Sequence, residues 1–172
     1  SSNPQSGSIQ ADWIAPLVMD PSDHMNVYHF SDSVFISNRF GEEGSWKYLS
    51  NPNIGVIRHA AIAENNSDIM VVAQNARLNL STDKGLTWKS IFNGLPSYAI
   101  ADVIFDSNVD STILVCFERY EADNKKIYIS HNLGRTWTNI TANLGNMPIR
   151  TLAIDHTRNR NIYVGAEIGL FV

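Results

Sequence analysis

Short apolar runs separated by polar turns make up most of this chain. The runs are rich in Val and Ile and are bounded by Asn, Asp, Gly or Pro, as Val103–Phe105 and Ile113–Phe117 are on either side of the turn at Asp106. Short β-branched runs between turn residues are typical of strands, whereas an amphipathic helix repeats its apolar positions every three or four residues over a longer stretch. The pattern therefore predicts an all-β fold.

The same pattern recurs about every 42 to 49 residues. In each repeat an acidic residue ends a first apolar run, and a second apolar run begins seven residues later. The acidic positions are Asp20, Glu64, Asp106 and Asp155, and the second runs begin at Val27, Val71, Ile113 and Ile162. This spacing predicts that Glu64 is equivalent to the three aspartates.

Each of the first three repeats continues with a third run, a tight turn and a fourth run that begins with tryptophan. The third runs are 34–37, 78–81 and 127–130, and the tryptophans are Trp46, Trp88 and Trp137. Four short strands in a repeat of this length are typical of a β-propeller blade. We predict a partial β-propeller of antiparallel blades after a flexible lead-in at 1–10. Three blades are complete, at about 11–51, 54–95 and 97–145, and a fourth, at 147–172, has three strands.

The turn before each tryptophan, which we call a box turn, has a recurring sequence. Residues 81–88 read Ser-Thr-Asp-Lys-Gly-Leu-Thr-Trp, in which the Asp accepts hydrogen bonds from the turn and Gly adopts a positive φ. Residues 130–137 have Asn132 at the acidic position, which predicts a weaker turn because the charge is lost. Residues 37–46 form a degenerate copy with two extra residues and Arg39 at that position.

These box turns resemble those of the Asp-box (bacterial neuraminidase repeat) β-propeller superfamily, over essentially everything after residue 10. The phrases at Trp13–Pro21 and Pro148–Phe171 are most similar to repeat-containing secreted or surface proteins of Bacteroidetes and to xyloglucanase-type glycosidases. More remotely, the chain is similar to sialidases and to sortilin-type receptors. The resemblance implies that the box turns are folding devices remote from any ligand. It assigns this structural role to Ser81, Asp83, Gly85, Thr87, Trp88, Ser130, Asn132, Gly134, Thr136 and Trp137.

Composition narrows the classes of function. A formal net charge of −4 argues against a nucleic-acid surface, which needs a basic patch. The sequence has no apolar run near the roughly 20 residues of a membrane helix, and no zinc, calcium or phosphate-loop motif, so no metal or cofactor is expected. The single cysteine, Cys116, lies in an apolar run and is expected to be a buried hydrophobe.

Propeller geometry places the candidate binding residues on one face. The turns between first and second strands share one face with the box turns, and we call it the turn face. The links between blades and the loops between second and third strands form the opposite face, the link face. The link face is expected to gather Trp13, Arg58, His59, Tyr98, Asp102 and Arg150, together with Arg119, Tyr120, Glu121 and Asp123 from about seven extra residues at 118–125. Aromatic rings beside planar polar groups suit sugar binding, although ordinary solvated loops also contain such residues.

Three functions are compatible with these residues. We expect a binding or scaffold module of a secreted or cell-surface bacterial protein, which contacts carbohydrate or protein through the link face. The alternatives are a fragment of a glycoside hydrolase and a sortilin-like peptide-binding propeller. A glycosidase needs two carboxyl groups flanking the scissile bond. Asp102 and Glu121 are the candidates, with Asp12 and Asp123 as further options.

The resemblance also bears on activity and on partners. In xyloglucanase-type enzymes the catalytic carboxyl groups come from two propellers, so this chain alone is not expected to be active. The expected protein partners are the remaining blades of a longer chain, or a second copy that completes the ring.

Overall fold

The computed structural model describes residues 13–120, 123–155, 157 and 160–172, and every regular element among them is a strand. The predicted lead-in at 1–10 lies outside the described residues. The first sheet contains β1 (Leu17–Met19), β2 (Val27–Phe30), β3 (Val34–Ser37) and β4 (Lys47–Ser50). The second contains β5 (His59–Ile62), β6 (Met70–Gln74), β7 (Arg77–Ser81) and β8 (Lys89–Ser90).

The third sheet contains β9 (Ile100–Asp106), β10 (Val109–Phe117), β11 (Ile127–Ser130) and β12 (Thr138–Asn139). The fourth contains β13 (Ile149–Ile154), β14 (Ile162–Ala166) and β15 (Gly169–Phe171). Strands pair antiparallel and in chain order within each sheet. The prediction of an all-β partial propeller, with three four-stranded blades and three strands of a fourth, is confirmed.

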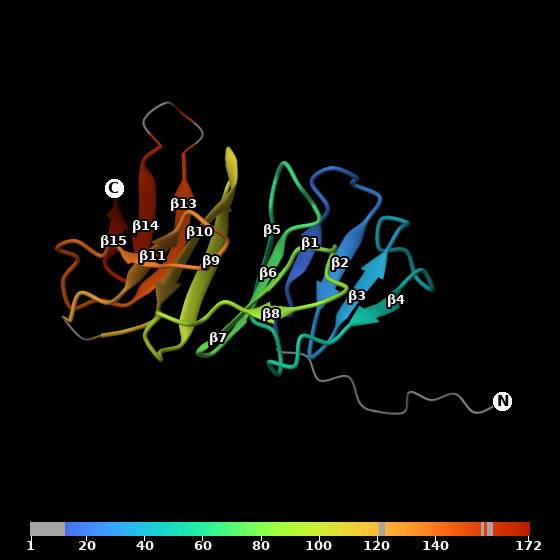
Figure 1. Cartoon of the computed structure of the whole chain (residues 1–172), viewed down its shortest axis with the longest axis horizontal. Helices are drawn as coiled ribbons and strands as arrows, with labels where there is room; N and C mark the ends of the chain where they lie inside the picture. Colours follow the sequence, from blue (N-terminus) through green and yellow to red (C-terminus); the bar gives the residue numbers. More distant parts are fainter. Residues whose placement is uncertain (1–12, 121–122, 156, 158–159) are drawn as a thin grey trace.

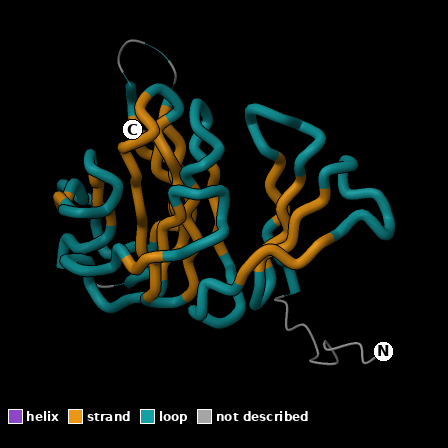
Figure 2. Tube along the Cα trace, turned by 45° about the vertical axis from the view of Figure 1, so that its right-hand side comes forward, coloured by secondary structure: helices purple, strands orange, loops and turns teal. Residues whose placement is uncertain are grey.

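The blades follow one another side by side in chain order, from blade 1 in blue to blade 4 in red (Figure 1). The turns that join β1 to β2, β5 to β6 and β9 to β10 lie along the upper edge of this view, and the links from β4 to β5 and from β8 to β9 lie along the lower edge. The tube view contains strands and loops only (Figure 2). No helix among the described residues is long and apolar enough to cross a membrane.

The register of the second blade corrects one prediction. Asp20 N donates to Asn26 O at the end of β1, and the same bond in blade 2 runs from Ala63 N to Ile69 O, both at 2.9 Å. Ala63, not Glu64, is therefore the equivalent of Asp20. The strand β6 accordingly begins at Met70, one residue before the predicted run at Val71. The regular spacing of acidic residues hid this shift because Glu64 follows Ala63 directly.

The core consists of three interfaces between neighbouring sheets. Because side chains alternate along a strand, Val72 of β6 faces blade 1 and Val71 of the same strand faces blade 3. Leu114 and Cys116 of β10 pack towards Leu152 of blade 4 in the same way. Cys116 is buried, as predicted, and burial raises the pKa of its thiol well above the ordinary value. Each inner blade thus buries both faces, as propeller packing requires.

The box turn at Ser81–Trp88 is closed by its own side chains. Asp83 Oδ1 accepts hydrogen bonds from Thr87 N at 2.9 Å and Ser81 Oγ at 2.7 Å, and Asp83 Oδ2 accepts one from Thr87 Oγ1 at 2.6 Å. Lys84 and Gly85 have φ values of 59° and 79°, so the turn uses left-handed backbone at two successive residues. Lys84 N also donates to Asp68 O at 3.0 Å, which joins the box turn to the turn between β5 and β6.

Polar contacts on the turn face connect successive blades. Ser67 Oγ of blade 2 donates to the carboxylate of Asp20, which is buried at the end of β1. Asn65 Nδ2 donates to Asp110 Oδ1 of blade 3 at 3.1 Å. Arg160 of blade 4 forms an ion pair with the buried carboxylate of Asp106. These bonds fix the relative rotation of neighbouring sheets at the edge opposite the link face.

Candidate functional site

The link face is assembled by backbone bonds between the links and the loops of the preceding blade. Ile57 N donates to Ser31 O at 2.8 Å, and Ile100 N donates to Asn75 O at 2.9 Å. Both acceptors lie in loops between the second and third strands of their blades. Each link therefore crosses the loop of the blade before it, and side chains at the start of each inner strand meet on one surface.

A cavity of about 270 Å³ lies on this surface at the start of the first three inner strands. Arg58 and His59 of blade 2 and Asp102 of blade 3 form its polar wall, and Ile14 and Pro16 contribute apolar atoms from the approach to β1. The remaining lining residues are Leu17, Val18 and Ala60. Three predicted site residues are thus brought together. Trp13 directly precedes this apolar lining, and its side chain is 97% exposed.

Burial of His59 favours the neutral form of its imidazole. Burial lowers the pKa of His59, and the nearby Arg58 guanidinium lowers it further, while the carboxylates of Asp102 and Glu118 oppose the shift. A neutral imidazole offers one donor and one acceptor, whereas an imidazolium offers only donors. His59 also bonds to the backbone of Ile100, which engages one of its two ring nitrogens within the protein.

The carboxylate of Asp102 is used inside the protein. Its Oδ1 accepts a hydrogen bond from Val103 N at 2.8 Å, and its Oδ2 accepts bonds from Thr151 Oγ1 at 2.8 Å and Leu152 N at 3.0 Å. The two donors to Oδ2 belong to β13, so Asp102 joins the inner strands of blades 3 and 4. This arrangement orients the carboxylate as a structural acceptor at the edge of the cavity.

The extra residues of blade 3 are anchored by two cationic side chains. The guanidinium of Arg119 lies 3.5 Å from the centre of the Tyr98 ring and forms a 3.0 Å ion pair with Asp123. Lys126 Nζ donates to Arg119 O at 2.8 Å and to Met147 O at 2.7 Å, and the Lys126 side chain is fully buried. Sequence reasoning missed this role of Lys126 because a lysine that follows a polar loop is usually a solvated residue.

Arg150 lies between two carboxylates. Its guanidinium forms ion pairs with Glu167 and Glu118, and hydrogen bonds to both raise the pKa of Arg150. Tyr120 Oη also donates to Glu167 Oε1 at 3.0 Å. Arg150 and Tyr120 were predicted as site residues, but their partners Glu118 and Glu167 were not. Glu167 could have been found, because it lies in the loop between the second and third strands of blade 4.

The predicted residues therefore form two groups on the link face. Arg58, His59 and Asp102 line one cavity, while Tyr98, Arg119, Tyr120 and Arg150 stabilise the loop of blade 3 and its contact with blade 4. Glu121 and Asp12 lie outside the described residues. No cluster of three His, Cys, Asp or Glu residues that could hold a metal ion occurs in the described part of the chain.

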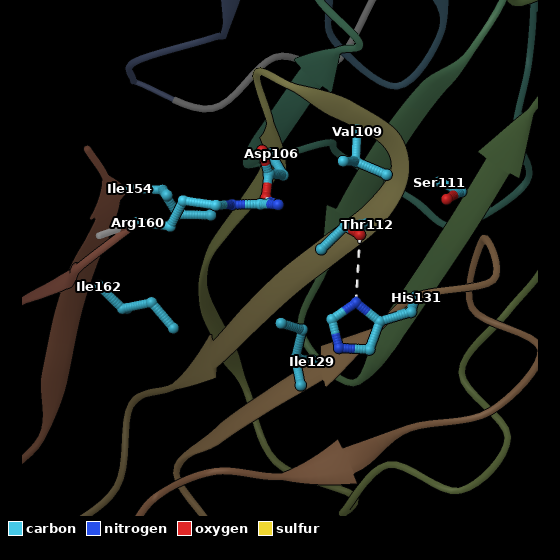
Figure 3. Close-up of a pocket in the computed structure, with 9 residues that line it drawn as sticks. All are labelled: Asp106, Val109, Ser111, Thr112, Ile129, His131, Ile154, Arg160 and Ile162. Atoms are coloured by element: carbon cyan, nitrogen blue, oxygen red, sulfur yellow. Dashed lines mark hydrogen bonds and ion pairs between the residues drawn. The ribbon is translucent and has the colours of Figure 1, made fainter. Parts of the chain in front are cut away.

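A second cavity, of about 300 Å³, lies on the turn face between blades 3 and 4 (Figure 3). Arg160 and Asp106 point towards each other on one side of it, and His131 Nδ1 lies 3.2 Å from Thr112 Oγ1 on the other. Isoleucines at 129, 154 and 162 complete the wall. In this cavity Arg160 is thus paired with Asp106, and His131 with Thr112.

No protein-family model matches the chain, and no curated protein matches it. Solved structures do match it. The GH74 xyloglucanase from Xanthomonas campestris aligns with a TM-score of 0.69 and 16% identity, over 87% of this chain and 26% of the enzyme. The Niastella koreensis GH74 enzyme aligns with a TM-score of 0.70 and 22% identity, over 89% of this chain and 26% of the enzyme.

A chain of a nidogen/laminin complex also matches, with a TM-score of 0.65 and 18% identity, over 92% of this chain and 56% of that one. At these identities the likeness shows the β-propeller fold alone. The chain spans about a quarter of the length of the two GH74 enzymes.

Proposed function

We propose that this chain is a carbohydrate-binding segment of a secreted or cell-surface β-propeller protein of the Asp-box type. The observation behind the proposal is the link-face cavity, where Ile14 and Pro16 adjoin Arg58 and His59, and where the exposed Trp13 directly precedes Ile14 in the chain. Aromatic rings stack on the apolar faces of pyranoses, and planar polar groups bind their hydroxyls. The hydrogen bonding of the box turn at Asp83 supports the Asp-box assignment.

The bonds that the carboxylates of the link face form within the protein favour a non-catalytic role. General acid–base cleavage of a glycoside needs two carboxyl groups directed at the scissile bond. Asp102 accepts bonds from β13, and Glu118 and Glu167 are both bound to Arg150. These three groups are thus engaged within the protein, which leaves the cavity suited to binding.

Titration calorimetry with xyloglucan oligosaccharides tests the proposal. We expect saturable binding that Trp13→Ala and Arg58→Ala each weaken by about tenfold, the usual scale for removing a central contact. Tyr48→Ala is the matched control, because Tyr48 is also an exposed aromatic residue but lies in β4, away from the cavity. Loss of binding in the control alone, or no binding to the unaltered chain, would count against the proposal.

A glycoside hydrolase fragment is the second candidate function. It is favoured by the propeller fold shared with the GH74 enzymes and by the carboxylate Asp102 at the edge of the cavity. In this case a full-length protein would release reducing sugar from xyloglucan, and Asp102→Ala would abolish the release. Unchanged turnover in that variant would exclude Asp102 from catalysis.

A further inference from the structure

A groove of about 500 Å³ lies beside β8, the edge strand of blade 2, and we call it the edge groove. Lys89 and Ser90 of β8 line one side, and Leu133 and Arg135 from the box turn of blade 3 line the other. The two blades that enclose it each have four strands. The edge groove is therefore a feature of the junction between two complete blades.

Contacts between the two blades hold the walls of the edge groove in place. Trp137 Nε1, at the end of the box turn, donates to Ile91 O, directly after β8, at 2.9 Å. A Cβ placed on Gly134 would lie 2.6 Å from Ile91 Cδ1, so the box turn packs closely on the end of β8. A site with fixed walls avoids the cost of ordering them when a ligand binds.

Two cationic side chains line the edge groove. Lys89 and Arg135 are exposed, and neither forms an ion pair with a carboxylate in the described part of the chain. None of the described residues that line the groove is acidic. Asn132, which stands where blade 2 has Asp83, also keeps the box turn beside Arg135 free of negative charge. In a chain of net charge −4, the edge groove is thus locally cationic.

The equivalent place between blades 1 and 2 has different side chains. Leu86 of blade 2 occupies the position of Arg135, directly after the glycine of the box turn. Tyr48 of blade 1 occupies the position of Ser90, because each is the second residue of its fourth strand and pairs with the third. A cation has thus replaced an apolar residue, and a small side chain a large one. The repeat itself does not require the edge groove.

The other lining residues indicate the class of ligand. Thr82, Ser90 and Asn93 offer hydroxyl and amide groups, and Leu80 and Leu133 offer apolar surface. Guanidinium and ammonium groups bind carboxylates and sulfates, while small polar groups bind hydroxyls and apolar ones cover pyranose faces. An extended peptide would instead pair with a strand edge, and β8 has only two residues. The combination favours an acidic sugar over an acidic peptide.

We propose that the edge groove binds an acidic oligosaccharide, whose carboxylate or sulfate groups are held by Lys89 and Arg135. The edge groove and the link-face cavity share no lining residue. The proposal can therefore be tested separately from the function proposed above. A neutral xyloglucan oligosaccharide is not expected to bind in the edge groove, because it brings no anion to the two cations.

Amide chemical shifts of the isotopically labelled chain, titrated with oligogalacturonic acid and then with a sulfated chondroitin oligosaccharide, test this proposal. We expect saturable shifts at Lys89 and Arg135 with one or both acidic sugars, and none there with neutral xyloglucan oligosaccharides. The acidic sugar that binds identifies the anion. No saturable shift at these residues with either would overturn the proposal. Tighter binding of a polyglutamate peptide at the same residues would also overturn it, because the groove would then be a peptide site.

Variants that remove one charge locate the site. Lys89→Ala and Arg135→Leu should each weaken binding by about fivefold, the upper range for an exposed ion pair. Arg135→Leu supplies the side chain that blade 2 has at this place, so the box turn should form normally. Lys47→Ala is the matched control, because Lys47 is also exposed and pairs with Ile36 as Lys89 pairs with Leu80. It should retain binding, and equal weakening in all three variants would overturn the proposal by showing nonspecific attraction.

Discussion

A single carboxylate determines how the box turn at Ser81–Trp88 is closed. Hydrogen bonds from Thr87 and Ser81 lower the pKa of Asp83. The turn of blade 3 achieves the same closure with an amide, because Asn132 Oδ1 accepts from Thr136 N at 2.9 Å and Asn132 Nδ2 donates to Thr136 Oγ1 at 2.8 Å. The acceptor oxygen is therefore the common requirement, and the charge is a secondary contribution.

Substitution of Asp83 separates these two contributions. Asp83→Ala removes both carboxylate acceptors, while Ser81 Oγ still accepts from Gly85 N, and should lower the free energy of unfolding by about 1 kcal/mol, the usual net value of such bonds. Asp83→Asn should lose less than half of that amount, because it reproduces the arrangement at Asn132. Urea denaturation of the three proteins measures the difference. Equal losses in both variants would show that the charge, and not the acceptor geometry, stabilises the turn.

Two histidines should make the fold sensitive to mild acid. Burial lowers the pKa of both His29 and His59 below the ordinary value of 6.5. Below about pH 6.5 the unfolded chain therefore takes up protons more readily than the folded one, and stability decreases as pH falls.

Urea midpoints at pH 7 and pH 5 measure this sensitivity. We expect a lower midpoint at pH 5, and His59→Gln should reduce the change between the two pH values. Equal changes in the variant and the unaltered chain would show that His59 does not contribute. Carboxylates with lowered pKa values, such as Asp20 and Asp155, titrate below this window and so do not mask the result.

At the scale of elements, the packing of one box turn on the preceding blade can be tested with two glycines. Gly134 and Gly44 have nearly the same positive φ, at 74° and 76°. A Cβ at Gly134 would collide with Ile91, whereas a Cβ at Gly44 would have no atom within 4 Å. Comparing alanine substitutions at the two glycines therefore separates the effect of the contact between blades from the effect of backbone strain.

Gly134→Ala should destabilise the chain more than Gly44→Ala does, by about 1 to 3 kcal/mol, the usual cost of overpacking. Both variants introduce a similar strain from a positive φ, so the difference between their losses of stability measures the contact with Ile91. Thermal unfolding of the two variants measures it. Equal midpoints would show that the box turn of blade 3 is not packed tightly on blade 2.

The strands themselves could be predicted from sequence, since their apolar runs are short, β-branched and separated by turn residues. The shift of one residue in blade 2 could not, because Glu64 next to Ala63 mimics the acidic end of the other first strands. Spacing reports where turns fall, but only the backbone bond from Ala63 N to Ile69 O identifies the equivalent residue. The positions of the turns could therefore be predicted from the sequence, whereas the register of blade 2 was predicted one residue too late.

At the scale of the whole molecule, the two faces were predictable and the pairing of residues across blades was not. Fourfold repetition alone brings Arg58, His59 and Asp102 to one cavity. The donors that occupy Asp102 come from Thr151 and Leu152, about 50 residues away in sequence, and no local pattern marks them. This is why Asp102 looked like a catalytic candidate in the sequence, while in the structure it joins two blades.

We propose that the ligand binds at the link face and not at the turn face. Titration of xyloglucan oligosaccharides into isotopically labelled chain, followed by amide chemical shifts, tests it most directly. We expect shifts clustered at Arg58, His59 and the approach to β1, with the box turn at Ser81–Trp88 unaffected. Shifts centred on the turn face, around the cavity of Arg160 and His131, would contradict it.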